Sequence, residues 1–337
     1  MKASIIALAY NQLEQGTKPC IESIYKYTNE DDFELIIVDN NSSDNTAQYL
    51  ESLKKEKNNV KIVLNKTNRG YAGGNNDGIK LATGDIIILL NNDTLITPYW
   101  LENLIKPFEY DDKIGLVGPV TNNALSVQCL NFENINSENY LEKTKKYLKD
   151  NNGRWFETSR LTFFCVAIRK EMLNTVGLLD ESYQKGYFED DDYCKRVIKA
   201  GFKLVCAEDS FVYHMGCLSF KTIGNSNFDT LMQKNRKLFI KKHKAYSHNC
   251  DNLKTIIDKL EQEIKIVKNC CDNQNIENME LRLNSLKIIL EQTKELEGYL
   301  VKKYQGPFLK SIFRVIKDNC VFLNNLDVLF KKLPIKK

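Results

Sequence analysis

The 337-residue sequence predicts an α/β fold, in which a mostly parallel sheet is covered by helices on both faces, followed by an all-helical extension. Three observations lead to this prediction. Short apolar runs alternate with helical patterns along the first part of the chain, fourteen of the sixteen glycines precede residue 250, and helical periodicity takes over beyond that point. We therefore expect an α/β domain at residues 1–248 and a helical extension at residues 249–337.

Four buried strands are expected first, each an apolar run that ends in polar residues. They cover residues 4–9, 33–42, 60–64 and 85–90. Helices are expected between them, at residues 19–27, from the capping residues 41–44 to Leu53, and at residues 75–81. Strands that alternate with helices in this way form parallel pairs joined by crossover helices.

The pattern changes after another apolar run at residues 115–120. Residues 122–152 are polar and have no clear period, so we expect a long loop with a functional role. The regular pattern then resumes with a strand running into a helix at 161–173, a helix at 189–200 and one or two short strands at 203–212.

Positive charge is concentrated at the C-terminal end. With 48 Lys and Arg against 44 Asp and Glu, the net charge of +4 is too small to indicate a nucleic-acid-binding protein. Apolar residues spaced by four and three at 253–290 predict a helical hairpin, and residues 302–337 form a basic amphipathic tail. We expect this tail to lie on an anionic membrane surface, or to pack on the hairpin or on a second copy in a homodimer.

Cysteine spacing and hydropathy indicate the compartment. The ten cysteines are scattered without C-x-x-C pairs, which favours reduced thiols in a cytosolic protein. The N-terminus lacks the features of a signal peptide, and no apolar run is long enough to span a bilayer. We expect a cytoplasmic protein, at most peripheral at the inner face of the membrane.

Polar residues at the ends of the first two strands are candidates for binding a nucleoside. Ligands of open parallel sheets bind beyond the carboxyl ends of the strands. Tyr10 follows the first strand and can lie beside a planar base, while the Asp39 carboxylate can accept from a base N–H or a sugar hydroxyl. These segments are also ordinary turn sequences, but their joint occurrence at strand ends favours a ligand site.

Asp93, after the fourth strand, is a candidate metal ligand. Its oxygen suits Mg²⁺ or Mn²⁺, and a metal there would neutralise a diphosphate. His214, at the end of a late strand, can complete the metal set, although a single His is more often structural. Between the third and fourth strands, residues 68–76 are glycine-rich and lead into a helix, so Arg69 can pair with a phosphate there. This stretch is neither a dinucleotide fingerprint nor a Walker loop.

Four consecutive carboxylates, Glu189 to Asp192, start a predicted helix. The helix dipole stabilises negative charge at this position, but the four carboxylates repel one another. A structural role therefore explains one or two of them and not all four. A general base held at the start of the helix explains more, and the alternative is a solvated acidic cap.

In this order, these segments closely resemble the family 2 inverting glycosyltransferases, which have the GT-A fold, and within them the rhamnosyltransferase-like group. The matching segments are SIIALAYN, ELIIVDNNSSDNT, NRGYAGGNNDGI, GDIIILLNNDT, GLLDESYQKGYFEDDDYCKRVIKAGFKLV and VYHMG. They cover residues 1–244 and leave the C-terminal helices outside the resemblance.

The resemblance implies roles for residues of the donor and metal sites. Ala9, Tyr10 and Asp39 would contact the donor nucleobase, with Arg69 nearby. Asn91, Asn92 and Asp93 stand where the family has D-x-D, so Asp93 would bind Mn²⁺ or Mg²⁺ together with His214. Asn91 departs from the family pattern and removes one carboxylate.

The resemblance also implies the base and its surroundings. Asp190 would be the catalytic base, although Asp191 and Asp192 leave this assignment open by one or two positions. The acceptor-side candidates are Glu189, Asp191, Trp155 and Tyr187. Residues 122–155 and 219–227 are expected to shape the acceptor site.

The implied activity is an inverting, single-displacement transfer of a sugar from a UDP-hexose or dTDP-rhamnose. The acceptor would be a hydroxyl of a glycan, glycolipid or protein, as in cell-surface polysaccharide biosynthesis. One alternative is a catalytically silent module that binds sugar nucleotides or serves assembly. Another is a nucleotidyltransferase, but the residues after the first strand, Tyr10-Asn11-Gln12, are not the glycine-rich phosphate loop it requires.

Overall fold

The computed structural model describes residues 1–124, 126–216 and 225–243, together with positions 261, 280, 281, 283, 284 and 287. The predicted domain boundary at residue 248, the helical hairpin, the basic tail and most of segment 219–227 lie outside the described residues and stay predictions. Within the described part, no helix combines the length and the apolar character needed to cross a membrane.

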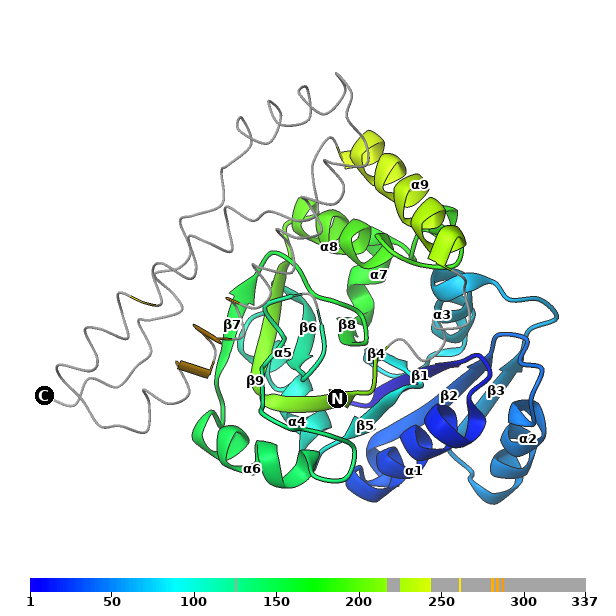
Figure 1. Ribbon diagram of the computed structural model, residues 1–337, viewed down its shortest axis with the longest axis horizontal. Coiled ribbons are helices and arrows are strands. Elements are labelled where there is room, and N and C mark those ends of the chain that lie inside the picture. The colour runs from blue at the N-terminus through cyan, green and yellow to red at the C-terminus, as the bar shows by residue number, and fades with distance from the viewer. Residues whose placement is uncertain are drawn as a thin grey trace, which may run out of the picture.

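The described strands form one mixed sheet (Figure 1). They are β1 (Ala3–Ala9), β2 (Phe33–Asp39), β3 (Val60–Leu64), β4 (Ile86–Asn91), β5 (Thr94–Ile96), β6 (Ile114–Val120), β7 (Trp155–Thr158), β8 (Cys165–Arg169) and β9 (Lys203–His214). Their order is β3-β2-β1-β4-β8-β6-β9-β5, and β7 pairs with β9. Because β5, β7 and β8 alone run against the other six, the predicted mostly parallel sheet is confirmed.

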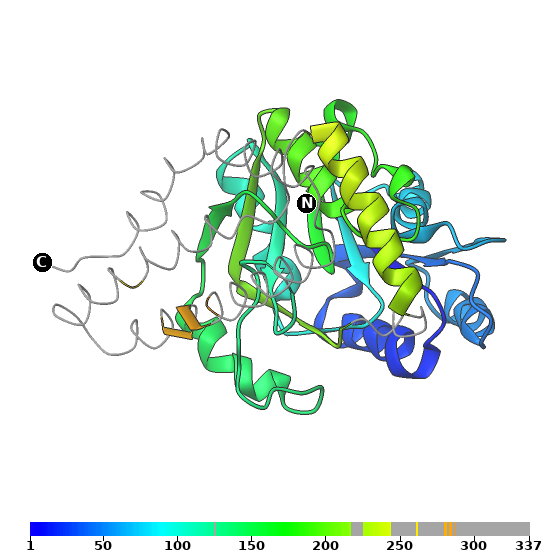
Figure 2. The same cartoon turned by 45° about the horizontal axis from the view of Figure 1, so that its top comes forward.

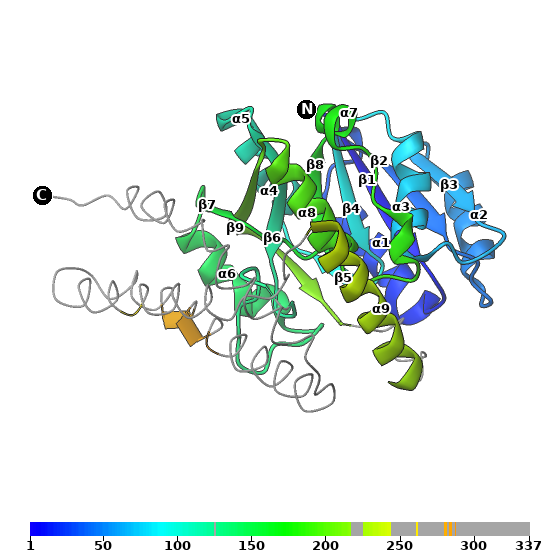
Figure 3. The ribbon, with the colours of Figure 1, turned by 90° about the horizontal axis from the view of Figure 1, so that it is seen from above.

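Helices cover both faces of this sheet. They are α1 (Lys18–Tyr27), α2 (Thr46–Glu56), α3 (Gly70–Leu81), α4 (Trp100–Ile105), α5 (Pro107–Tyr110), α6 (Tyr140–Asp150), α7 (Leu173–Val176), α8 (Glu189–Lys199) and α9 (Asn225–His243), with short turns η1 (Leu13–Thr17), η2 (Glu30–Asp32), η3 (Lys170–Met172) and η4 (Glu181–Tyr183). In Figure 1, α3, α8 and α9 lie above the sheet and α1, α2 and α4 below it. Figure 3 shows the same arrangement from above.

The core is divided by the sheet into two layers. Successive strand residues point to opposite faces, so Ile5 of β1 packs with α1, α2 and α4, whereas Ile6 packs with α3 and α8. A Cβ on Gly74 or Gly78 of α3 would come within 2.4 Å of Leu8 or Ile6. These glycines therefore allow α3 to lie close against the sheet.

Three of the predicted elements differ in the structure. The helix expected at 75–81 begins at Gly70, because close packing on the sheet outweighs the poor helix propensity of the glycines. The expected loop at 122–152 contains α6, whose buried face of Tyr140, Thr144 and Tyr147 has the helical period that the polar composition masked. The one or two short strands expected at 203–212 are the single strand β9.

Candidate active site

The carboxyl ends of β1 and β2 lie side by side at one edge of the sheet. Ala9 is opposite Asp39 in the strand register, and the Asn40 amide donates to the Ala9 carbonyl at 2.8 Å. The Asp39 side chain is buried, and its Oδ1 accepts from the Ser42 amide at 3.1 Å. The structure thus brings Ala9 and Asp39 together, with the half-buried Tyr10 next to them in the chain.

Asn11, which the sequence prediction did not assign to the site, joins the loops that follow these two strands. It has a positive φ of 54°, a conformation that asparagine tolerates better than most residues. Its backbone amide donates to Ser42 Oγ at 2.7 Å, and its side-chain Oδ1 accepts from the backbone amide of Ser43 at 2.7 Å. The two loops are therefore fixed to each other by neutral hydrogen bonds.

Asn40, also missed by the sequence prediction, connects β2 to the start of α3. Its Oδ1 accepts from the Arg69 amide at 2.9 Å, and its Nδ2 donates to the Gly70 carbonyl at 3.0 Å. The side chain is buried, so these bonds satisfy groups that water does not reach. Its position directly after Asp39 at a strand end was the sequence signal that could have identified it.

The Arg69 side chain is engaged by two carboxylates. It forms ion pairs with Asp77 and, at 2.7 Å, with Glu181. Both terminal nitrogens thus have partners within the chain, and a contact between Arg69 and a donor phosphate stays a prediction.

The structure brings the two predicted metal ligands together. Strand β5 pairs with β9 so that Thr94 lies opposite His214, and His214 Nε2 lies 3.3 Å from Asp93 Oδ1. His214 Nδ1 lies 2.8 Å from the Asn123 carbonyl. Because a carbonyl can only accept, this contact places the hydrogen on Nδ1 in the neutral ring and leaves the Nε2 lone pair facing Asp93.

This pair suits a divalent cation that also binds substrate oxygens. Among the residues that the structure describes, no group of three or more His, Cys, Asp or Glu side chains is arranged for a metal. One carboxylate and one oriented imidazole fit Mn²⁺ or Mg²⁺, whose other ligands would come from substrate phosphates and water. Asn92 is turned elsewhere, since its Nδ2 donates to Thr17 Oγ1 at 2.9 Å, while Asn91 ends β4.

Two of the four carboxylates at the start of α8 are held in ion pairs. Asp191 contacts Arg160 Nε at 2.5 Å. Asp192 is fully buried and contacts Arg196, Lys242 and His243 at 2.8, 2.6 and 2.6 Å. Burial alone would raise the pKa of Asp192, but the hydrogen bonds from His243 and Lys242 and the charge of Arg196 lower it to about 2.

The other two carboxylates form no such ion pairs with the residues that the structure describes. Glu189 is buried, its Oε2 has no hydrogen-bond partner in the described part of the chain, and burial together with Asp190 raises its pKa well above the ordinary value. Asp190 is the partly exposed member of the four. Burial, reinforced by Asp191 and opposed by Arg160, raises the pKa of Asp190 to about 7. Asp190 is therefore poised to exchange a proton near neutral pH.

The segment before β8 lies between the start of α8 and the Asp93–His214 pair. The Tyr71 hydroxyl donates to the Phe163 carbonyl at 2.5 Å, and burial followed by the nearby carboxylates of α8 raises the pKa of Tyr71. The next ring, Phe164, stacks on His214 with centroids 5.3 Å apart. This segment therefore links the two candidate parts of one site.

The acceptor-side candidates differ in their positions. Trp155 pairs with Ala207 on β9, seven residues along the strand from His214, and its acceptor-side role stays a prediction. Tyr187 lies two residues before the start of α8 and is half-buried. The start of the 122–155 segment does reach the site, because Asn122 Nδ2 donates to the His214 carbonyl at 3.1 Å.

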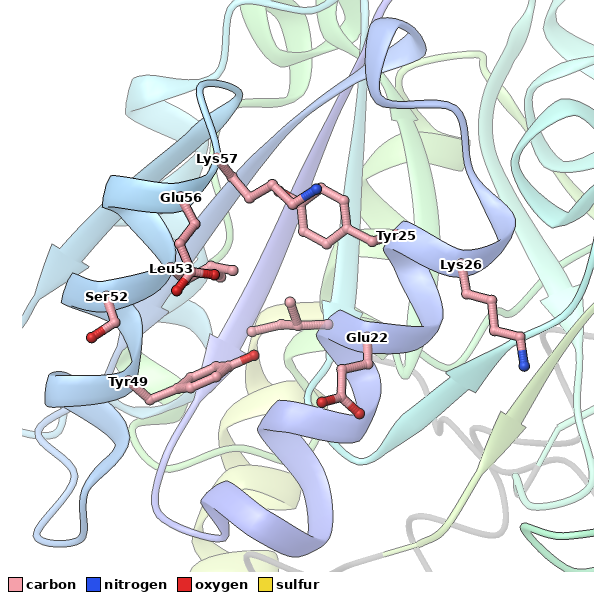
Figure 4. Close-up of a pocket in the computed structure, with 9 residues that line it drawn as sticks. Glu22, Tyr25, Lys26, Tyr49, Ser52, Leu53, Glu56 and Lys57 are labelled. Atoms are coloured by element: carbon pink, nitrogen blue, oxygen red, sulfur yellow. The ribbon is translucent and has the colours of Figure 1, made fainter.

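A surface groove of about 480 Å³ lies elsewhere, between α1 and α2 (Figure 4). Tyr25 and Tyr49 line it, with charged side chains around them. The Tyr25 hydroxyl donates to Asn59 at 2.9 Å, directly before β3 begins. The groove therefore extends toward the amino ends of the strands, away from the candidate site.

Comparison with known sequences identifies the family. The profile described as glycosyl transferase family 2 matches residues 4–177, just over half of the chain. The chain belongs to this family. The match ends before α8, so the family assignment rests on residues that precede the four carboxylates of that helix.

Curated relatives of this family member match over limited lengths. An uncharacterized glycosyltransferase of Haemophilus influenzae is 30% identical over 126 residues, covering 37% of this chain and 38% of the relative. Poly-β-1,6-N-acetyl-D-glucosamine synthase of Staphylococcus aureus is 39% identical over 87 residues, covering 25% of this chain and 20% of the synthase. The chain thus spans less than two fifths of the length of these relatives.

Solved structures share the fold. GalNAc-T7 with UDP, GalNAc and Mn²⁺ has a TM-score of 0.52 at 16% identity, covering 77% of this chain and 54% of that one. A mannosyltransferase of Pyrobaculum calidifontis with GDP-mannose and Mn²⁺ has a TM-score of 0.50 at 15% identity, covering 93% and 79%. At these identities the likeness concerns the fold alone, and the predicted GT-A fold is confirmed.

Proposed function

We propose that this family 2 glycosyltransferase transfers a sugar from a nucleotide-sugar donor to an acceptor hydroxyl, with inversion at the anomeric carbon and Asp190 as the base. One observation carries the proposal. Of the four carboxylates that start α8, Asp191 and Asp192 are held by cations and Glu189 is buried, so Asp190 is the partly exposed one, and its pKa is raised to about 7.

Asp190 accounts for the proton transfer in this reaction. Its carboxylate would take the proton of the acceptor hydroxyl while the hydroxyl oxygen attacks the anomeric carbon from the side opposite the leaving diphosphate. The C–O bond to the acceptor forms as the bond to the diphosphate breaks, so no covalent enzyme intermediate is required. A pKa near neutrality suits this role, because the group is deprotonated in much of the protein and still basic enough to accept a proton.

The donor would lie along the edge formed by Ala9, Tyr10 and Asp39, with its diphosphate toward Asp93 and His214. A divalent metal held by Asp93 and His214 would stabilise the negative charge on the diphosphate leaving group. The Mn²⁺ in the two solved glycosyltransferases of the same fold supports this metal dependence. Arg69 would approach the phosphates only by exchanging one of its carboxylate partners.

The donor is a UDP-hexose or dTDP-rhamnose in this proposal, and the acceptor is a glycan, glycolipid or protein. The relative from Staphylococcus aureus named as a poly-N-acetylglucosamine synthase supports a role in polysaccharide biosynthesis. A location on the inner face of the membrane depends on the basic tail and is part of the same proposal.

The test is a screen for nucleotide release and sugar transfer. The full chain is incubated with UDP-glucose, UDP-galactose, UDP-N-acetylglucosamine and dTDP-rhamnose, each with Mn²⁺ and with excess EDTA. We expect one donor to release nucleotide in the presence of metal and at least tenfold less in EDTA. Equal release with and without EDTA would remove the metal from the proposal, and no turnover of any donor would favour the catalytically silent binding module.

A further inference from the structure

The backbone that leads into α8 has an unusual conformation. Four of the five residues at 184–188 have positive φ, and only one of these is glycine. The values are 57° at Gln184, 138° at Gly186, 72° at Tyr187 and 73° at Phe188. Side chains with a Cβ rarely adopt such angles, so this segment needs support from the surrounding structure to keep its shape.

Asn235 of α9 supplies this support. Its side chain is fully buried, and its Nδ2 donates to the carbonyls of Tyr183 and Gly186, both at 2.7 Å. The Tyr187 carbonyl lies 3.2 Å from the same nitrogen. Three acceptors around one amide nitrogen require a donor at this point, which a carboxylate or a methyl group cannot provide.

The helix that carries Asn235 is itself anchored to α8. Lys242 and His243, at its end, contact the buried Asp192 of α8 at 2.6 Å each. Between these points, Phe239 packs on Phe188 with ring centroids 5.7 Å apart. Figures 1 and 2 show α9 lying beside α8, so Asn235 reaches the 183–187 carbonyls from a helix fixed at the same carboxylate cluster.

We propose that Asn235 is a positioning residue, which fixes the backbone before α8 and thereby the direction in which Asp190 is presented to the acceptor. The inference rests on the proposed function insofar as it names Asp190 as the base. The structural part, that the Asn235 amide holds residues 183–187 in their conformation, stands on the contacts alone.

Hydrogen exchange of the apo protein tests the structural part without any substrate. The variants are Asn235→Asp, which keeps the size and loses both N–H donors, and Asn235→Ala. The control is Lys237→Ala, because Lys237 is exposed on the same helix. We expect amide exchange in peptides covering 184–190 to rise at least tenfold in both Asn235 variants, with less than a twofold change in peptides from β1 and β4. Unchanged exchange at 184–190 overturns the proposal, as does a uniform rise throughout the chain or the failure of both variants to fold.

Kinetics test the consequence for transfer. With the donor identified in the screen, we expect Asn235→Asp to lower kcat at least thirtyfold while the Kd of UDP or dTDP with Mn²⁺ changes less than threefold. Lys237→Ala should match the unaltered chain in both measurements. A kcat of Asn235→Asp within threefold of that of the unaltered chain contradicts a positioning role. So does an equal loss of kcat and of affinity for UDP or dTDP. If the unaltered chain turns over no donor, the proposed function fails, while the exchange experiment still decides whether Asn235 holds the segment.

Discussion

The two ends of the candidate site are held together by different kinds of interaction. At the donor end, which we define as residues 9–11, 39–43 and 68–70, neutral amides and hydroxyls join the loops, and Arg69 adds ion pairs with Asp77 and Glu181. At the base end, residues 183–192, the buried carboxylates of Asp191 and Asp192 are matched with the cationic side chains of Arg160, Arg196 and Lys242. The comparison teaches that loops at strand ends can be joined largely by neutral hydrogen bonds, whereas a run of carboxylates with one raised pKa requires charged partners for its other members.

The contrast has a physical basis in the cost of burying charge. A buried carboxylate without a counter-ion is strongly unfavourable, so four in succession cannot all be ionised inside the protein. Arg160 neutralises the charge of Asp191, and Arg196 neutralises that of Asp192. Burial then acts on the remaining pair and raises the pKa of both Glu189 and Asp190.

The largest effect on stability is expected at the base end, from Asp192→Asn. The change leaves Arg196, Lys242 and His243 without their shared carboxylate, and we expect the free energy of unfolding in urea to fall by about 3 to 5 kcal/mol. Asp180→Asn is the matched control, because Asp180 pairs with Lys242 but is 28% exposed, and it should cost less than about 1 kcal/mol. Equal losses in the two variants would show that burial of the ion pair does not matter.

The same carboxylate gives a pH dependence with a defined sign. The pKa of Asp192 is lowered to about 2 in the folded protein, below its ordinary value of about 3.9 in the unfolded chain. Its stabilising contribution is therefore present above pH ~4 and is lost as the pH falls toward 2. Urea denaturation at pH 5 and pH 3 should show a smaller difference between these pH values in Asp192→Asn than in the unaltered chain.

A smaller loss is expected where the donor end meets the base end, at Gly70. This residue has a φ of 71°, and a Cβ there would lie 1.8 Å from the Gln184 carbonyl oxygen. Gly70→Ala should lower the free energy of unfolding by about 2 to 3 kcal/mol, because the backbone itself must move. Gly153 has a similar φ of 73°, but a Cβ there would have no atom within 4 Å, so Gly153→Ala should cost only about 1 kcal/mol. Similar losses of unfolding free energy in the two variants would mean that the close approach of Gly70 to the Gln184 carbonyl does not limit the residue at position 70.

The smallest effect is expected at the donor end, from Asn11→Gly. Glycine keeps the positive φ and removes the acceptor for the Ser43 amide, so the two strand-end loops are joined less firmly. We expect the affinity for UDP or dTDP, measured by titration with Mn²⁺, to fall three- to tenfold, or about 1 kcal/mol. Asn134→Gly serves as the control, since Asn134 has a φ of 53° in an exposed turn and should leave affinity unchanged. Unaltered affinity in Asn11→Gly would separate these loops from nucleotide binding.

The same comparison explains how much could be predicted from the sequence. Strand ends and their polar residues are local features, so Ala9, Asp39 and Asp93 could be placed at one edge of the sheet from the order of the elements. The pairing of Asp93 with His214 was proposed from the place of His214 at a strand end and from the family resemblance, and the structure provides its reason in the β5–β9 register.

The base end could be predicted only in part. Arg196 lies four residues after Asp192, a spacing that is visible in the sequence. Arg160, however, lies 31 residues from Asp191, and His243 lies 51 residues from Asp192, so no local pattern reveals these partners. The position of Trp155 could not be predicted for a related reason, because the pairing of β7 with β9 is set by the tertiary structure rather than by the local sequence.

The central claim is that Asp190 is the carboxylate left for chemistry, and the most direct test compares Asp190→Asn with the unaltered chain across pH. Since a base acts when deprotonated and the pKa of Asp190 is raised to about 7, kcat/KM of the unaltered chain should rise tenfold per pH unit below 7 and level off above it. Asp190→Asn should lower kcat by about 10² to 10⁴ and abolish this pH dependence while nucleotide affinity is retained. Turnover by Asp190→Asn within tenfold of the unaltered chain, with the same pH profile, would contradict the assignment.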